Sequence, residues 1–125
     1  MKQLLLIGTG GFVGALLRYG MIGAVQRMFP GMTFPLGTLA VNLVGCLCIG
    51  LLTGLADARQ VLAAEARAFL LIGVLGAFTT FSTFGHETFV LMREGEPMRV
   101  LANVAGHVIL GLGCVWAGYA VGTIR

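Results

Sequence analysis

Charged residues are scarce in this 125-residue chain, and their scarcity excludes an ordinary soluble protein. They make up 10% of the chain, whereas soluble domains carry about 25%. So few charges cannot cover a water-facing surface, particularly because 58% of the residues are hydrophobic. The charges also cluster between long apolar runs. We therefore interpret residues 1–125 as a single integral membrane domain.

Other features are missing as well. The three cysteines all lie inside apolar runs, and an odd count in such positions argues against a disulfide framework. Cys46 and Cys48 would point about 200° apart on a helix, so they cannot share a metal ion. The net charge of +3 includes no basic run, so nucleic acid is not an expected partner. Neither paired carboxylates nor a Ser/His/Asp or Cys/His arrangement suggests an enzyme.

Four apolar stretches each approach the roughly 20 residues that a helix needs to cross a bilayer. They cover residues 4–25, 34–56, 69–92 and 100–124. A cleavable signal peptide is not favoured for the first stretch, because Arg18 and Tyr19 interrupt it where a cleavage site should lie. The sequence therefore predicts an all-α membrane protein with four transmembrane helices.

Small residues four positions apart predict close contacts between these helices. Such pairs are Gly10 and Gly14, Gly50 and Gly54, and Gly118 and Gly122. Glycine has no side chain, so two helix backbones can approach each other closely at these positions.

The third stretch contains a segment that suits a continuous helix poorly. Residues 73–84 read GVLGAFTTFSTF, with two glycines, four hydroxyls and three phenylalanines. Glycine is a poor helix former, and threonine and phenylalanine are moderate ones. We expect a helix broken at mid-membrane, buried against protein or lining a cavity, because hydrocarbon does not tolerate unpaired backbone groups. Phe78, Phe81 and Phe84 would share roughly one face of any local helix.

Basic residues are divided almost evenly between the two ends of the predicted bundle. Leaving Arg18 aside, Lys2, Arg59, Arg67 and Arg125 lie on the N-terminal side, and Arg27, Arg93 and Arg99 lie on the other. Orientation normally follows an excess of Lys and Arg in cytoplasmic loops. The balance favours insertion in both orientations and an antiparallel homodimer. The alternative is a single orientation set by one or two charges.

Two charged residues lie inside apolar stretches. Arg18 comes sixteen residues after Lys2, about 24 Å along a helix, which places it beneath the far interface. It either extends to the headgroups or supplies a fixed positive charge that concentrates anions in a vestibule. Glu87, next to His86, is either an interfacial carboxylate or a group at a pore mouth.

Polar and aromatic side chains in the stretches have a simple and a functional interpretation. Asn42 and Asn103 would form interhelical hydrogen bonds or donate to an anion. His107 is more often a hydrogen-bonded interior histidine than a ligand. The phenylalanines would pack in the core or against lipid. Alternatively, their positive ring edges would accept a partly dehydrated anion and still let it leave.

Three motifs together carry a resemblance to a known family. They are GFVGALLRY at residues 11–19, GTLAVNLVG at 37–45 and the segment at 73–84. In this order and spacing they closely resemble the bacterial fluoride channel family, called Fluc or CrcB, and the fourth stretch agrees in length and position. The resemblance implies a fluoride-selective channel in the cell membrane, an antiparallel dimer with two pores that lets fluoride leave the cytoplasm passively.

The resemblance also implies roles for single residues. A structural sodium ion at the dimer centre would be held by the backbone carbonyls of Gly76 and Thr79. Phe81 and Phe84 would line the pore, Asn42 would supply an amide, and Arg18 would lie in the vestibule. Thr80, Ser82, Thr83 and Glu87 match family positions around the break and the pore. A hard cation prefers oxygen ligands, and two carbonyls from each chain would supply four.

The fourth stretch departs from the family pattern. A polar track there often has Tyr and then Ser at four-residue steps, where this chain has Asn103, His107 and Gly111. We place Asn103 and His107 in the fluoride pathway. Because a histidine can titrate near neutrality, His107 predicts pH-dependent conduction.

Two other classes of function are alternatives to a channel. A small drug/proton antiporter with four helices and dual topology needs a carboxylate in its first helix, where this chain has Arg18 and no acid. A structural subunit of a larger complex would explain the glycines but not the cluster of Thr, Ser and Phe.

Overall fold

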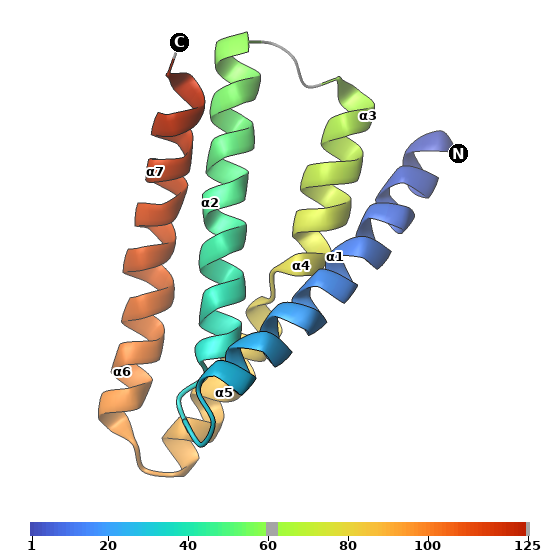
Figure 1. The fold of residues 1–125 in the computed structure, drawn as a ribbon. Coiled ribbons are helices and arrows are strands. Elements are labelled where there is room, and N and C mark those ends of the chain that lie inside the picture. The colour runs from blue at the N-terminus through green and yellow to red at the C-terminus, as the bar shows by residue number, and fades with distance from the viewer. Residues whose placement is uncertain (60–62, 125) are drawn as a thin grey trace.

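A computed structural model describes residues 1–59 and 63–124 (Figure 1). Within these ranges all regular secondary structure is helical, and four helical segments are long and apolar enough to cross a membrane. The segments run alternately up and down, with both termini at the same end of the molecule. The prediction of an all-α protein with four such segments is confirmed.

The first two segments are continuous helices, and the last two are interrupted or distorted. The first two are α1 (Lys2–Met28) and α2 (Leu36–Arg59). The third consists of α3 (Ala64–Arg67), the π-helical η1 (Ala68–Leu75), α4 (Gly76–Phe78) and α5 (Phe81–Arg93). The fourth consists of α6 (Pro97–Ala105), the π-helical η2 (Gly106–Leu110) and α7 (Gly111–Thr123). π-Helical turns are frequent at functional sites, and the sequence pattern did not predict them.

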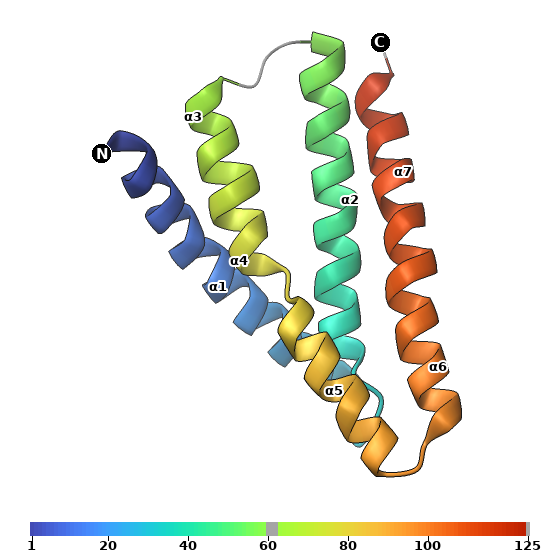
Figure 2. The same cartoon turned by 180° about the vertical axis from the view of Figure 1, so that it is seen from behind.

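Helices α2 and α7 lie side by side along their length (Figures 1 and 2). A Cβ atom added at Gly50 or Gly54 would collide with the α7 backbone. One added at Gly118 or Gly122 would collide with the α2 backbone. Two of the three predicted glycine contacts are therefore confirmed. The glycine pair of α2 and the glycine pair of α7 belong to the same interface between these two helices.

Helix α1 crosses the third segment in the same way. A Cβ atom at Gly10 would meet the carbonyl oxygen of Phe69, and one at Gly14 would meet that of Val74. The third glycine contact is confirmed, and it holds α1 against the residues that precede the break.

The break separates three phenylalanines that the sequence pattern placed on one face. Phe78 is 7% exposed and packs with Val41 and Leu75, whereas Phe81 is 83% exposed. The expectation is wrong for Phe78. Thr79 and Thr80, between α4 and α5, are extended, so α5 does not continue the helical periodicity of α4. Phe81 and Phe84 remain together on α5, whereas Phe78 belongs to the core.

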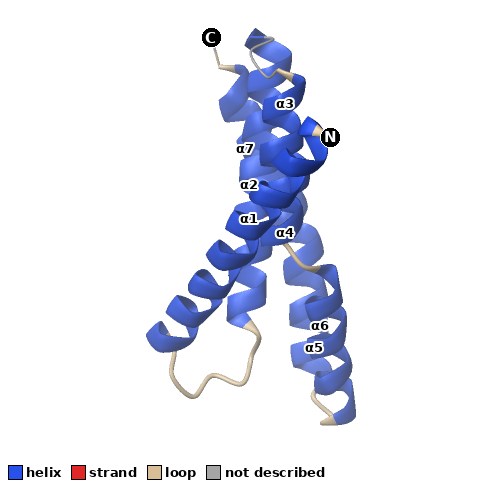
Figure 3. Cartoon of the chain, turned by 90° about the vertical axis from the view of Figure 1, so that its right-hand side faces the viewer, coloured by secondary structure: helices blue, strands red, loops and turns tan. Residues whose placement is uncertain are grey.

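The basic residues lie at the two ends of the bundle as the sequence indicated. Lys2 and Arg67 lie at the end with the termini, where Lys2 Nζ is 3.1 Å from Glu65 Oε1. Arg27, Arg93 and Arg99 lie at the opposite end. Arg125 is outside the described residues. Toward the opposite end, α1 with the α1–α2 connection diverges from α5 and α6 (Figure 3).

Candidate functional site

The helical interruption lies at Thr79 and Thr80, within the stretch where the sequence predicts a break. Thr79 has φ −82° and ψ 161°, and Thr80 has φ −152° and ψ 117°, so both residues are extended. Thr80 caps α5, because its Oγ1 accepts a hydrogen bond from the Thr83 backbone N–H at 3.3 Å. The Thr80 hydroxyl also donates to Thr83 Oγ1 at 2.9 Å and lies 3.4 Å from Ser82 Oγ. Threonine is a favoured residue at this capping position.

Asn42 bridges α2 to the break. Its Nδ2 donates to the Thr80 carbonyl at 3.0 Å, and its Oδ1 accepts from the Thr80 N–H at 2.9 Å. One side chain therefore satisfies both backbone groups of Thr80, which the interruption leaves outside the helix. Gly45, three residues further on, lies so close to the Thr79 methyl group that a Cβ atom there would collide with it. Asn42 thus forms the interhelical hydrogen bonds of its simple interpretation.

The backbone carbonyls that lose their helical donors at the break include those of Gly76 and Thr79. In a continuous helix the Thr80 N–H would donate to Gly76 and the Thr83 N–H to Thr79. Here the Thr80 N–H donates to Asn42 Oδ1, and the Thr83 N–H donates to Thr80 Oγ1. The carbonyl oxygens of Gly76 and Thr79 are therefore released from the helical pattern.

An open cavity of about 410 Å³ lies beside the break. We call it the central cavity; its wall includes Asn42, Thr79, Thr80, Phe81, Phe84 and His107. The ring centroids of Phe81 and Phe84 are 5.5 Å apart, and those of Phe84 and His107 are 4.3 Å apart. The cavity thus brings together aromatic rings from α5, an imidazole from η2 and polar groups at the break.

The environment of Asn103 differs from that of the predicted pathway residues in the central cavity. It is fully buried, and its Nδ2 donates to Thr88 Oγ1 at 2.9 Å. The Thr88 hydroxyl in turn donates to the Phe84 carbonyl at 2.7 Å. Asn103 therefore ties α6 to α5, and it is not among the residues that line the central cavity.

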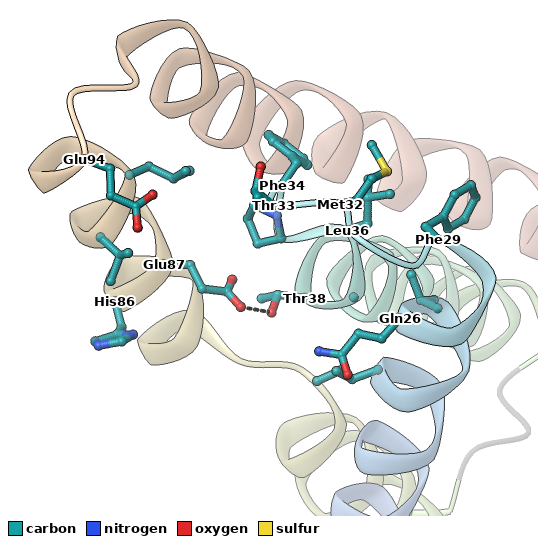
Figure 4. A pocket seen from close by; sticks show the side chains of 16 residues that line it. Gln26, Phe29, Met32, Thr33, Phe34, Leu36, Thr38, His86, Glu87 and Glu94 are labelled. Atoms are coloured by element: carbon teal, nitrogen blue, oxygen red, sulfur yellow. Dashed lines mark hydrogen bonds between the residues drawn. The ribbon is translucent and has the colours of Figure 1, made fainter.

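A second cavity of about 500 Å³, the end cavity, lies between α5 and the region where α1 meets α2 (Figure 4). Glu87 extends across it from α5, and Thr38 Oγ1 donates to Glu87 Oε1 at 2.7 Å. Glu87 Oε2 is buried and has no hydrogen-bond partner among the described residues. The end cavity thus contains a carboxylate held by one hydroxyl.

Besides Asn103, three predicted residues line neither cavity. Arg18 is half-buried on α1, Ser82 is exposed on α5, and Thr83 is half-buried next to the cap. Sequence reasoning in turn missed Thr38 and Thr88, which are both buried. Thr38 precedes Asn42 by four residues and so lies on the same helix face, a spacing that could have identified it.

Comparison with known proteins gives consistent matches over nearly the whole chain. A family model described as "CrcB-like protein, Camphor Resistance (CrcB)" matches residues 5–119. A protein of Nitratidesulfovibrio vulgaris named "Fluoride-specific ion channel FluC" is 43% identical over 124 residues, which cover 99% of each chain. A protein of Chlorobaculum tepidum with the same name is 46% identical over 118 residues, 94% of this chain and 92% of the other. "Fluoride-specific ion channel FluC 1" of Methanosarcina acetivorans is 44% identical over 118 residues, 94% of this chain and 88% of the other. These matches and the four helices of spanning length show that the chain belongs to the CrcB-like family of multi-pass proteins of the cell membrane, as its three motifs predicted.

Proposed function

We propose that this chain forms a fluoride-selective channel through which fluoride leaves the cytoplasm passively. One observation carries the proposal: Phe81 and Phe84 lie side by side in the central cavity, directly after a helix break. The names of the relatives, fluoride-specific ion channels, support it.

The chemistry of the central cavity suits a small anion. A phenyl ring is positive at its edge, so Phe81 and Phe84 would attract fluoride more weakly than a full charge does. An amide nitrogen carries two hydrogens, and Asn42 uses one for the Thr80 carbonyl, which leaves one for an anion. Several weak donors would replace the water around fluoride, and none would bind it too tightly for conduction.

The break would lie near the middle of the membrane and at a dimer interface. It falls close to the centre of the apolar segment Ala64–Arg93. In the single chain Phe81 is 83% exposed and Gly76 is exposed beside the irregular backbone. Lipid does not tolerate irregular backbone on its own, so a second copy would cover this face. The balanced basic residues at the two ends favour an antiparallel arrangement.

A structural sodium ion would bind the carbonyl oxygens of Gly76 and Thr79. These residues fit such an ion, because both carbonyls have lost their helical donors and both residues line the central cavity. Hard cations prefer oxygen ligands, and the two-fold partner would contribute the same pair. When bound, the ion supplies positive charge that stabilises the assembly, and it is not transported.

The pathway would continue from the central cavity through the residues around it. Thr80, Ser82 and Thr83 would offer hydroxyls near the break, and His107 would lie beside Phe84. Asn103, buried behind Thr88, would position this part of the pathway. At the ends, Glu87 in the end cavity would border the pore mouth, and Arg18 would concentrate anions in the vestibule.

A flux measurement on purified protein in proteoliposomes tests the proposal. Wild-type protein is expected to release fluoride without a proton gradient, and Phe81→Ile to reduce this flux about tenfold or more, equivalent to at least about 1.4 kcal/mol. Phe89→Ile is the matched control, because Phe89 is an exposed phenylalanine on α5 that lines neither cavity.

Other outcomes identify other functions. If Phe81→Ile conducts fluoride like the wild type, the assignment of the pore is wrong. Cation exchange driven by a proton gradient, without fluoride flux, would indicate the antiporter. The absence of both activities would indicate a structural subunit.

A further inference from the structure

The ring of His107 is held in one tautomer. Its Nδ1 is 2.9 Å from the carbonyl oxygen of Asn103, one turn earlier on the same segment. A carbonyl oxygen has no hydrogen to donate, so this hydrogen bond requires a hydrogen on Nδ1. A neutral imidazole carries one hydrogen in total, so Nε2 of neutral His107 presents a lone pair.

That lone pair has no partner. Nε2 is buried, and no described residue forms a hydrogen bond with it. A buried polar atom without a partner is uncommon in folded proteins and calls for an explanation. Because Nδ1 is turned toward the backbone of its own segment, Nε2 lies on the other side of a ring that lines the central cavity.

Protonation would reverse the character of this atom. The neutral ring presents a lone pair, which repels an anion, whereas the protonated ring presents a positively charged N–H donor. The Phe84 ring lies beside that of His107, with the two centroids 4.3 Å apart.

We infer that His107 is a proton-controlled anion site, at which Nε2–H of the protonated ring binds one fluoride ion beside Phe84. The inference rests on the proposed channel function and adds a proton to it. Fluoride and the proton bind together, so each raises the affinity of the site for the other. The proton remains on Nε2 while the anion passes.

Other titratable groups lie around this ring. On α5, Glu87 is close enough for charge–charge interaction with His107, and His86 is its neighbour in sequence. On α2, Cys46 is the other titratable residue that lines the central cavity, and Cys114 of α7 interacts with it. Because these groups also carry protons, their contributions have to be separated from that of His107 itself.

The two histidines of the chain allow this separation. We would measure the fluoride concentration that gives half-maximal flux at pH 8 and at pH 5.5, with protein-free vesicles correcting for leakage of hydrogen fluoride. In wild-type protein and in His86→Gln, this concentration is expected to fall about tenfold at the lower pH, equivalent to about 1.4 kcal/mol. In His107→Gln it should not change with pH, because a glutamine amide keeps its N–H at both values.

Two results would overturn the inference. One is a half-maximal concentration that is the same at both pH values in conducting wild-type protein. The other is an unchanged pH dependence in His107→Gln, which would assign the titration to Glu87 or another group.

A second measurement does not require conduction. Nitrogen NMR of histidine-labelled protein should show hydrogen on Nδ1 of His107 at pH 8, and added sodium fluoride should raise the pH at which this ring titrates. Sodium chloride at equal concentration is the control. If fluoride shifts this titration in a protein that conducts no fluoride, the proposed function fails and the site stands. If fluoride leaves the titration unchanged, the site is disproved whatever the flux.

Discussion

Helix α2 packs against two regions that are built in opposite ways. Toward α7 it presents Gly50 and Gly54, which let the two backbones come into direct contact. Toward the break it presents Asn42, which binds both backbone groups of Thr80. One side of the helix therefore forms a close-packed frame, and the other side supports a polar, irregular segment.

The difference shows how a small membrane protein can hold an irregular site in place. Close helix contacts in lipid come from small residues and van der Waals packing. Irregular backbone is tolerated at membrane depth only when protein groups satisfy it. The α2–α7 pair supplies a rigid support, so that Asn42 can hold the break while Gly76 and Phe81 stay exposed.

The largest effect should come from breaking the frame. Gly118→Val would force a side chain into the backbone of α2 at Leu47 and Leu51, and we expect a loss of about 3 kcal/mol of stability, because neither backbone can move aside. Gly113→Val is the matched control on the same helix, since a Cβ atom there meets nothing within 4 Å. Size-exclusion chromatography and thermal unfolding in detergent would measure both. Equal behaviour of the two variants would contradict the role of the glycine contact.

A smaller effect is expected at the break. Asn42→Ala leaves the N–H and the carbonyl of Thr80 without their partners, and we expect about 2–3 kcal/mol of destabilisation from unpaired backbone groups. Thr53→Ala on the same helix removes a hydroxyl that bonds only to its own helix at Ile49, and it should stay within about 0.5 kcal/mol of wild type. Thermal unfolding compares them. A neutral Asn42→Ala would mean that the break does not depend on this amide.

The smallest effect should come from removing sodium, and it should be confined to the break. With sodium at about ten times its Kd, linkage predicts about 1.4 kcal/mol of stabilisation. Replacing sodium by choline should therefore speed hydrogen exchange at Phe81 and Ser82, and leave Gly118 and Gly122 unchanged. Uniform exchange rates in the two salts would remove the support for an ion at Gly76 and Thr79.

Much of the fold follows from patterns that depend on local sequence. Long apolar stretches predict helices because a backbone in lipid has to satisfy itself. The Gly10–Gly14, Gly50–Gly54 and Gly118–Gly122 pairs predict contacts because a small-residue stripe permits close approach, although they do not say which helix is the partner. The run of threonines after Gly76 predicts an interruption for the same local reason.

Side-chain surroundings were harder to predict. Asn103 and His107 are four residues apart on one segment, yet the first is buried against Thr88 and the second lines the central cavity. Only the fold brings Glu87, 49 positions away in sequence, beside Thr38. Spacing along one helix predicts a face, but the neighbour on that face comes from another helix.

The sequence by itself determined the membrane environment, the four helices, the break and the family, because each depends on composition or on residues close together in the chain. Only the tertiary structure decided that Asn42 binds the backbone of Thr80, that Phe78 belongs to the core, and that His107 lies beside Phe84. These features depend on how far the chain turns at Thr79 and Thr80 and on which helices then meet. That geometry results from packing the whole chain, and no short stretch of residues contains it.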